Sequence, residues 1–380
     1  MIKLTTLALV TVPLWGVTCP AGYGYWGSLT IDHTQVGSSD SSNFPVLFTG
    51  DTSLKTVGNG GKVQSSSGYD IIVGSVSGSA YNFERVIWSA SSGSGGEWWA
   101  EIPTLSHSSN TTFYVFYGNA SITTDQQSSP WDSNYAMVQH LPNGSSLTAN
   151  DSTANANNGT NANATATTGE IDGGAAFNGS NADIDFGLAS SLQITGNITA
   201  ELWFNATSWP PTGNDYVMFD EGYSFGSNTR GWELRLYNFS STNYIYWDTN
   251  TGSIHGCSAS TSTSTGTWHH LVGTWNGTAW TAYLDGVQFC TSTDSQAPQN
   301  NSVHVVAGAL GSSIGNPFFN FPGSLDELRV SNTNRSVDWI TAEYNNQSSP
   351  SGFLASSSWG NACGAVLTSA PLRSLMGVGQ

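Results

Sequence analysis

Two of the acidic pairs in this sequence are candidates for chemistry. Glu170 and Asp172 are two residues apart, so on a β-strand both carboxylates would point to the same face. The second pair is Asp326 and Glu327, which are adjacent in the run GSLDELRV. In its plainest interpretation Asp326 caps a turn and Glu327 faces solvent.

The adjacent histidines are weak candidates for a metal site. His269 and His270 are adjacent, and adjacent residues of a strand point to opposite faces, so the two imidazoles cannot easily bind one metal ion. We expect one ring to pack and the other to be exposed. The sequence has neither an H-E-x-x-H motif nor a phosphate-binding loop.

Aromatic residues are numerous, with 15 Trp and 14 Tyr in 380 residues. Rings that stack on sugar faces, with amides and carboxylates that bind hydroxyls, are how β-sandwich modules hold glycans. Trp209 precedes two prolines, Tyr223 lies in a glycine-rich loop, and Trp247 follows Tyr246. Arg235 alternates with apolar neighbours and therefore lies on the opposite face of its strand. The predicted ligand-binding set is Trp209, Tyr223, Glu233, Arg235 and Trp247.

These side chains need strands to position them, and the clearest strands lie in residues 266–290. Trp268–Trp275 and Trp280–Leu284 alternate apolar and polar residues around a loop that contains Asn276 and Gly277, which predicts a β-hairpin. Asp285-Gly286 makes a second turn, so Val287–Cys290 is expected to return as a third antiparallel strand.

The N-terminal third shows short apolar runs separated by Gly/Ser turns and has no helical period of useful length, which predicts a β-sandwich. The expected strands are Gly27–Ile31, Phe44–Phe48, Tyr69–Val73, Arg85–Trp88, Trp98–Ile102 and Phe113–Tyr117.

One helix is predicted near the C-terminus. Ser336 can cap it, Asp338 lies in its first turn, and Val337, Ile340 and Tyr344 fall on one face. We expect this helix to cover an end of a sandwich. The following residues have no clear period and are expected to form a loose surface tail.

Composition limits the possible partners. Nine basic residues against 26 acidic ones give a net charge of −17, so phosphate backbones and anionic membranes are poor partners, and we expect no nucleic-acid binding. Lys3 followed by the apolar run Leu4–Trp15 has the length of a signal peptide rather than of a membrane span; a short first strand is the alternative. We expect the mature chain not to insert into a membrane.

The four cysteines have no metal-binding spacing, and their even number in an expected export product predicts disulfides. Cys257 precedes the hairpin and Cys290 ends its third strand, so a bond between them would staple this meander. A Cys19–Cys363 bond follows only by elimination.

The hairpin, with the opening stretch around Asp151, Gly173 and Phe177 and the later FPGSLDELRVSN, resembles the laminin-G-like, concanavalin A-like jelly rolls from about Ala136 to Leu354. The resemblance implies that Trp203, Trp268 and Trp275 are core residues. It also implies a structural Ca²⁺ held by Asp326 with Asp151, because Ca²⁺ takes oxygen ligands.

Glucanases of that superfamily carry E-x-D-x-x-E on a strand. Glu170 and Asp172 match its first half, but Ala175 stands where the second Glu belongs. The resemblance therefore implies that the stretch is a turn into a core strand and that the proton donor of a retaining hydrolase is missing.

The N-terminal stretches YWGSLTIDHTQV, NFPVLF, EWWAEIPTLS and TTFYVFYGNASITTDQQ resemble the domain family DUF2341, which has no assigned activity. The expected organisation is a signal segment at 1–19, a DUF2341-like sandwich at 20–132, a jelly roll at 133–354 and a tail at 355–380.

The fold class is therefore all-β, with two sandwich domains. The expected function is non-catalytic glycan binding or adhesion by a secreted or cell-surface protein. The alternative is a structural or decoration component of a surface layer, filament or virion that self-associates, and a glycoside hydrolase is third.

Overall fold

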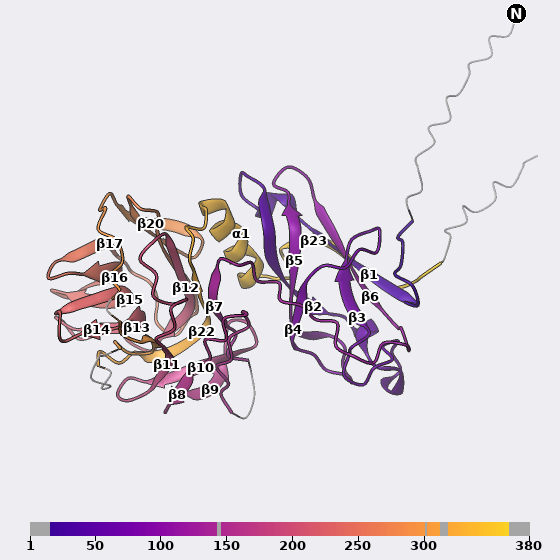
Figure 1. Ribbon diagram of the computed structural model, residues 1–380, viewed down its shortest axis with the longest axis horizontal. Helices are drawn as coiled ribbons and strands as arrows, with labels where there is room; N and C mark the ends of the chain where they lie inside the picture. Colours follow the sequence, from indigo (N-terminus) through magenta and orange to yellow (C-terminus); the bar gives the residue numbers. More distant parts are fainter. Residues whose placement is uncertain (1–15, 143–145, 301, 312–317, 365–380) are drawn as a thin grey trace, which may run out of the picture.

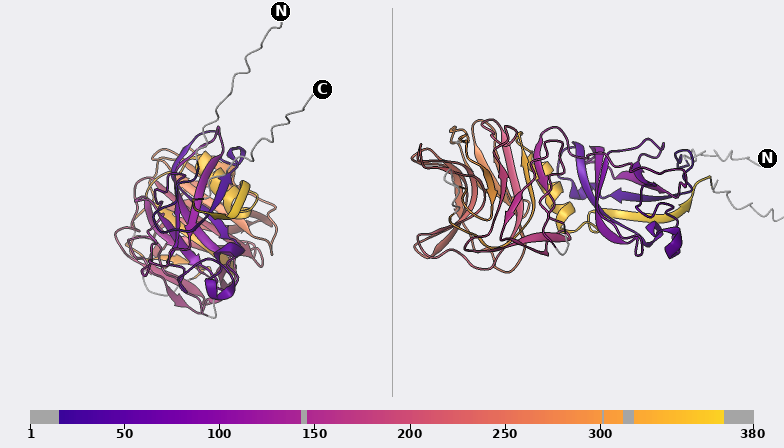
Figure 2. Two further views of the ribbon diagram at one scale, coloured as in Figure 1. Left: turned by 90° about the vertical axis from the view of Figure 1, so that its right-hand side faces the viewer. Right: turned by 60° about the horizontal axis from the view of Figure 1, so that its bottom comes forward.

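The computed structural model describes residues 16–142, 146–300, 302–311 and 318–364. Two β-rich domains lie side by side along the long axis of the molecule, and the single helix of the described chain lies between them (Figure 1). A view from another side shows the same arrangement (Figure 2). The predicted all-β class with two sandwiches is confirmed, and the Leu4–Trp15 run lies outside the described residues.

The first domain consists of two antiparallel sheets with the strand orders β23-β1-β6-β3 and β2-β5-β4. Aromatic residues of both sheets, such as Phe48, Trp98 and Phe113, are fully buried between them. All six strands predicted for this region are present. Their bounds are β1 (Tyr25–Ile31), β2 (Ser41–Gly50), β3 (Ile71–Gly74), β4 (Phe83–Ile87), β5 (Gly95–Leu105) and β6 (Thr111–Tyr117), with short 3-10 turns at His33–Gln35, Thr52–Leu54 and Val57–Asn59.

The last strand of the first domain comes from the other end of the chain. β23 (Leu354–Ala362) pairs antiparallel with β1, and the ring of Trp359 lies where a side chain at Gly27 would be. The expectation of a loose tail after residue 354 is therefore wrong up to Ala362, because these residues complete a sheet. Residues 365–380 lie outside the described part of the chain.

The second domain consists of two eight-stranded sheets. The proximal sheet, nearer the first domain, has the order β20-β19-β18-β12-β22-β10-β9, with β7 beside β22 (Figure 1). Its strands are β7 (Tyr135–Gln139), β9 (Thr165–Thr168), β10 (Gly173–Asn178), β12 (Ile198–Ala206), β18 (His269–Trp275), β19 (Trp280–Leu284), β20 (Val287–Ser292) and β22 (Pro322–Ser331).

The distal sheet has the order β17-β16-β15-β13-β21-β11-β8, with β14 beside β15. Its strands are β8 (Thr160–Ala162), β11 (Asp183–Gly187), β13 (Asp215–Glu221), β14 (Tyr223–Ser224), β15 (Thr229–Phe239), β16 (Thr242–Asn250), β17 (Ile254–Ser260) and β21 (Val305–Ala307). The core between the two sheets contains Trp232, Trp247 and Trp280. The predicted meander is β18-β19-β20, so that prediction is confirmed.

The described chain contains two disulfides, with sequence separations of 33 and 344 residues. Cys257 of β17 bonds to Cys290 of β20, which joins the edge strands of the distal and proximal sheets. Cys19 bonds to Cys363 and ties the two ends of the first domain together. Both predicted pairs are confirmed. A segment removed on export would have to end before Cys19, and not after residue 19 as expected from the sequence.

Helix α1 (Val337–Ser348) begins where predicted, since the Ser336 hydroxyl accepts a hydrogen bond from the Trp339 amide at 3.1 Å. Its buried face differs from the predicted one: Val337 is 49% exposed, whereas Ile340 and Trp339 are buried. Trp339 packs on Phe44 of the first domain, so the helix covers the proximal sheet and fills the space between the domains.

No helix in the described part of the chain is long and apolar enough to cross a membrane.

Candidate functional site

The outer face of the distal sheet carries a group of charged residues. Strand alternation turns Trp232, Leu234 and Leu236 of β15 into the core and places Glu233 and Arg235 on the opposite side. Neighbouring strands contribute further acids on the same outer face, namely Asp215 from β13 and Asp248 from β16.

Arg235 is the centre of this charged face and is only 3% exposed. Its guanidinium contacts Asp248 at 2.6 Å, Asp215 at 2.5 Å and Glu233 at 3.2 Å, and it lies 4.0 Å from the centre of the Tyr246 ring. Burial lowers the pKa of Arg235, but these carboxylates outweigh burial and raise the pKa well above its usual value. The group is a permanently charged part of the sheet.

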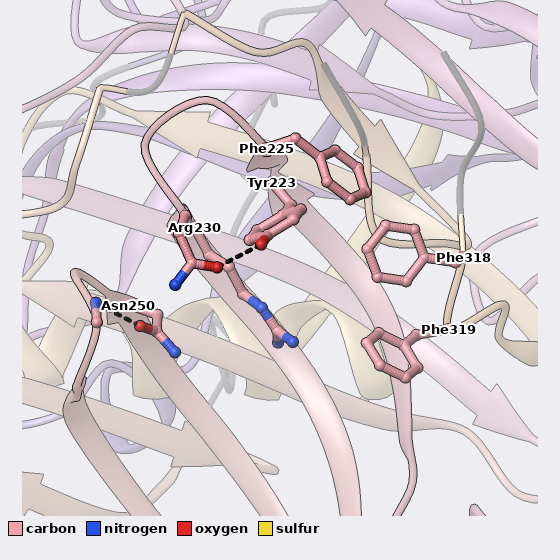
Figure 3. A pocket seen from close by; sticks show the side chains of 8 residues that line it. Tyr223, Phe225, Arg230, Asn250, Phe318 and Phe319 are labelled. Atoms are coloured by element: carbon pink, nitrogen blue, oxygen red, sulfur yellow. Dashed lines mark hydrogen bonds between the residues drawn. The ribbon is translucent and has the colours of Figure 1, made fainter. Parts of the chain in front are cut away.

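An open cavity of about 510 Å³ lies at one end of this face (Figure 3). One wall consists of four aromatic rings, and we call the cavity the aromatic pocket. It is lined by Tyr223, Phe225, Asn228, Arg230, Asn250, Gly252, Phe318 and Phe319.

The four aromatic rings of the pocket pack against one another. The Tyr223 and Phe225 ring centres are 4.7 Å apart, and Phe318 lies 6.1 Å from Tyr223 and 5.0 Å from Phe319. These residues come from distant stretches that backbone hydrogen bonds bring together: the Tyr223 amide donates to Gly311, and Leu310 pairs with Phe318.

The other side of the pocket is polar. Arg230 donates from Nη1 to both oxygens of Glu233, at 3.0 and 3.1 Å, and its guanidinium carbon lies 5.5 Å from the Phe319 ring centre. The side-chain oxygen of Asn228 accepts from the Tyr223 hydroxyl, and that of Asn250 accepts from the Gly252 amide (Figure 3). These bonds orient both amide groups at the pocket.

Only Tyr223 of the predicted binding set lines the pocket. Glu233 and Arg235 lie on the predicted face but are buried in ion pairs, with Glu233 touching the pocket's Arg230 from behind. Trp209 is partly buried against the core, and its indole donates to the Thr263 carbonyl at 3.3 Å.

Trp247 is fully buried between the sheets, and its indole donates to the Thr274 carbonyl at 2.9 Å. The prediction that Trp247 contacts a ligand is wrong, because its ring packs against Trp232 and Trp280 and has no exposed surface. Of the three expected core aromatics, Trp203 and Trp275 are buried and Trp268 is partly exposed.

The sequence interpretation missed the remaining pocket residues. Phe225 continues the loop of Tyr223, and Phe318-Phe319 is a pair of large apolar residues in a Gly/Asn-rich loop, which was an available signal. Arg230 was not predicted as a site residue. It lies at the start of β15, directly after the loop that carries Tyr223 and Phe225. Their convergence depends on pairing across some ninety residues, which the local pattern does not encode.

The segment Gly222–Gly226 has the spacing G-x-S-x-G of a serine nucleophile motif, which the sequence interpretation had taken to be absent. That motif requires a strand followed by a helix, which exposes the serine at a sharp turn. Here Ser224 lies in β14, which forms a hairpin with β15. The segment therefore shapes the pocket and does not form a nucleophile elbow.

The candidate catalytic pair lies in a turn. Glu170 and Asp172 precede β10, and Asp172 has a left-handed backbone with φ of 56°. Ala175 is fully buried within β10 and pairs with Leu325. The stretch is thus the turn into a core strand that the resemblance implied. Burial, with a smaller effect of Asp285, raises the pKa of Glu170.

The carboxylates predicted to hold calcium already accept hydrogen bonds. Asp151 accepts from the amides of Val138, Thr153 and Asn157 and so organises its loop. Asp326 is buried, and its two oxygens accept from the amides of Ile171 and Glu327. A cation would have to use the remaining lone pairs, and calcium binding by Asp151 and Asp326 stays a prediction.

The two adjacent histidines point to opposite sides, as expected. His269 is partly exposed and contacts Asp285 at 2.8 Å. His270 is 1% exposed and lies between Trp203 and Tyr344 under helix α1.

Comparison with known proteins places the second domain in a fold family. Residues 177–341 match the family model described as the concanavalin A-like lectin/glucanases superfamily. This is less than half of the chain, and together with the two packed sheets it identifies the second domain as a concanavalin A-like jelly roll. No curated protein matches the sequence of the chain.

Several solved structures match part of the chain at low identity. The binding domain of Paraclostridial Mosquitocidal Protein 1 matches with a TM-score of 0.44 and 15% identity, over 56% of this chain and 52% of that one. Domain 4 of an extracellular arabinanase from Geobacillus stearothermophilus, in complex with arabinotriose, matches with a TM-score of 0.41 and 16% identity, over 55% and 97%. A mutant Trypanosoma rangeli sialidase with trans-sialidase activity matches with a TM-score of 0.41 and 15% identity, over 58% and 33%. The chain therefore spans about half of the first of these and a third of the last.

Proposed function

We propose that the second domain binds a neutral glycan in the aromatic pocket and does not cleave it. The observation that carries this proposal is the combination, at one open cavity, of four aromatic rings with the side-chain amides of Asn228 and Asn250. Sugar rings stack their C–H faces on aromatic surfaces, and their hydroxyls bind amides, so the two walls suit the two sides of a pyranose or furanose.

The charges around the pocket favour a neutral sugar over an acidic one. Arg230 is the only basic residue among the lining residues, and Glu233 at 3.0 Å and Asp215 at 4.0 Å already balance its charge. The chain as a whole carries a net charge of −17, which repels an anionic ligand.

The expected affinity is weak. A sugar has few apolar faces and many hydroxyls whose water must be replaced, so one exposed site supplies about 4–8 kcal/mol, which corresponds to a millimolar to micromolar Kd. Adhesion to a glycosylated surface would then require several copies of the protein to bind together.

The location we propose is secreted or at the cell surface. Two disulfides in the described chain support it, because such bonds persist in oxidising compartments. We also propose that residues 20–132 are a DUF2341-like sandwich that presents the jelly roll.

A glycan array with the purified chain tests the proposal, followed by titration of the best sugar into two variants. Phe225→Ala removes a ring that is 49% exposed at the pocket and is expected to weaken binding about tenfold or more, the usual effect of losing one stacking ring. Phe239→Ala is the matched control, since Phe239 is 58% exposed on the same sheet but does not line the pocket.

Three results would contradict the proposal. Failure to bind any glycan would favour the structural or decoration component, for which self-association without sugar would then be measured. Equal losses in both variants would move the site away from the pocket. Release of reducing ends that disappears in Glu170→Gln would indicate a hydrolase.

A further inference from the structure

A buried group of charged side chains lies at the junction of the two domains, around helix α1. Its basic members are His140 and Arg329, and five carboxyl groups lie within ion-pair distance of them. We call this group the junction cluster. The five acids are Glu84 and Glu97 from the first domain and Glu201, Glu327 and Glu343 from the second.

One half of the junction cluster is held together by direct ion pairs between its own members. The Nδ1 atom of His140 lies 2.7 Å from Glu327 and 2.9 Å from Glu97, and the Trp99 indole donates to Glu97. Arg329 lies 4.5 Å from the centre of the Trp99 ring and contacts Glu327 at 2.5 Å. These groups form a connected set of ion pairs and hydrogen bonds.

Polar atoms without hydrogen-bonding partners occur in both halves: Glu97 Oε2, His140 Nε2 and Arg329 Nε in the first half, and three more atoms in the second. Glu201 of β12, His270 of β18 and Glu343 of α1 are 3%, 1% and 2% exposed, and one possible ligand atom from each lies within 4.8 Å of the others. The Oε2 atoms of Glu201 and Glu343 and the Nδ1 atom of His270 have no hydrogen-bonding partner. Leaving such atoms unpaired costs about 1–3 kcal/mol each, so three in one place require an explanation.

The charge balance of the junction cluster also requires an explanation. If the seven ion-paired groups named above were all ionised, five negative charges would face two positive ones; since Glu84 is only partly buried, the buried excess is two negative charges. Buried charges have to be paired or neutralised, either by protons or by a cation.

We propose that Glu201, His270 and Glu343 bind a divalent transition-metal ion of the Zn²⁺ class. Imidazole nitrogen and carboxylate oxygen are both ligands that zinc takes, whereas calcium prefers oxygen ligands alone. The ion would satisfy the three unpartnered atoms and remove most of the excess charge. This proposal is independent of the glycan site.

The state of His270 is compatible with this role. Burial, with a smaller contribution from Arg329, lowers the pKa of His270 to about 4, so its imidazole is neutral at pH 7 and can donate a lone pair. Arg329 contacts Glu343 at 2.5 Å and lies 3.8 Å from Glu201, and it also contacts Glu327 at 2.5 Å.

The ion would act as a structural clamp. It would join the helix to two strands of the proximal sheet. The same helix holds the first domain through Asn346, which accepts from the Leu47 amide at 2.7 Å and donates to the Leu47 carbonyl at 2.9 Å. Metal binding would therefore stiffen the junction between the domains.

The test is to produce the full, untagged chain with Zn²⁺ in the medium and to measure bound metals by mass spectrometry after dialysis. We expect one equivalent of zinc, a fall in melting temperature when a chelator removes it, and no comparable effect of Ca²⁺. X-ray absorption at the zinc edge should show one imidazole ligand, with the remaining ligands oxygens at about 2.0–2.2 Å.

His270→Gln should lose the bound zinc, whereas Glu97→Gln, in the other half of the junction cluster, should keep it. If His270→Gln does not fold, Glu201→Gln is the second variant and should also lose the zinc, because the neighbouring group Glu97, His140 and Glu327 has the same composition and only the variants separate the two. A folded wild-type protein that holds no zinc, zinc that stays in a folded His270→Gln variant, or a spectrum with two or more imidazoles would each overturn the proposal.

Discussion

At the scale of single residues, Glu97 lies in an unusual environment. It is 1% exposed, lies on β5 of the first domain, and faces His140 and Glu327 of the second domain. Burial raises the pKa of Glu97 to about 7, since the charge of Glu327 adds to burial and His140 only partly compensates. Below this pH the buried acid is neutral.

The stability of the protein should therefore depend on Glu97 and pH. Between about pH 4.5 and 7 the folded state holds a proton that the unfolded state has lost, so the contribution of Glu97 to the free energy of unfolding falls as the pH rises through this window. Glu97→Gln, which mimics the protonated acid, should gain about 3 kcal/mol over the wild type across this range, at 1.36 kcal/mol per pKa unit.

Denaturant titrations of both proteins at several pH values measure this difference. Glu101→Gln, on the same strand, controls for the removal of one negative charge. A stability difference between Glu97→Gln and the wild type that does not change with pH would show that Glu97 has the same charge in both states.

Single residues also show why the binding site was only partly predictable. The alternation along β15 correctly placed Arg235 on the face opposite Leu234, but it could not show that Tyr246 and Asp248 cover it. The local sequence also predicts Trp247 as a ligand contact, which the structure contradicts. The missed signal was Gly273 in the middle of β18: a Cβ there would lie 2.3 Å from the Trp247 ring, so the glycine makes room for a core tryptophan.

At the scale of elements, the local patterns were sufficient. The hairpin around Asn276-Gly277 and the helix capped by Ser336 depend on contacts within a few residues, and both formed where the sequence indicated. The helix face was predicted less well, because α1 packs on two domains at once and buries polar residues such as Glu343 and Asn346.

The disulfide between β17 and β20 is a feature whose contribution to the free energy of unfolding can be measured directly. These are the edge strands of the two sheets, and the Cys257–Cys290 bond closes a loop with a sequence separation of 33. Replacing both cysteines by serine should lower the free energy of unfolding of the second domain by about 3 kcal/mol, because the unfolded chain regains the entropy of the open loop.

Calorimetry of the double variant under non-reducing conditions checks this value. The first domain contains the other disulfide and serves as an internal reference, so its transition should not move. A second-domain transition that also stays in place would mean that β17 and β20 are held together without the bond.

At the scale of the whole molecule, the connection between the chain ends was the hardest feature to predict. The run Leu354–Ala362 is LASSSWGNA, whose polar residues and glycine give no clear strand period. It forms a strand because β1, more than three hundred residues earlier, provides an edge to pair with and Gly27 leaves space for Trp359. No local pattern contains this information, although the cysteines at 19 and 363 indicated it by elimination.

A chain that ends at residue 353 should therefore lose its first domain while keeping the second. Without β23 the sheet β23-β1-β6-β3 loses its edge, β1 exposes unpaired backbone groups, and Cys19 loses its partner. We expect rapid hydrogen exchange in β1 and β6 and early proteolysis of the first domain.

A chain that ends at residue 364 keeps β23 and Cys363 and is the matched control. Since the strands of the jelly roll all lie before residue 353, its exchange should be the same in both chains. Equal protection of β1 in the two truncated chains would show that the first domain folds without the returning strand, and that β23 only decorates its edge.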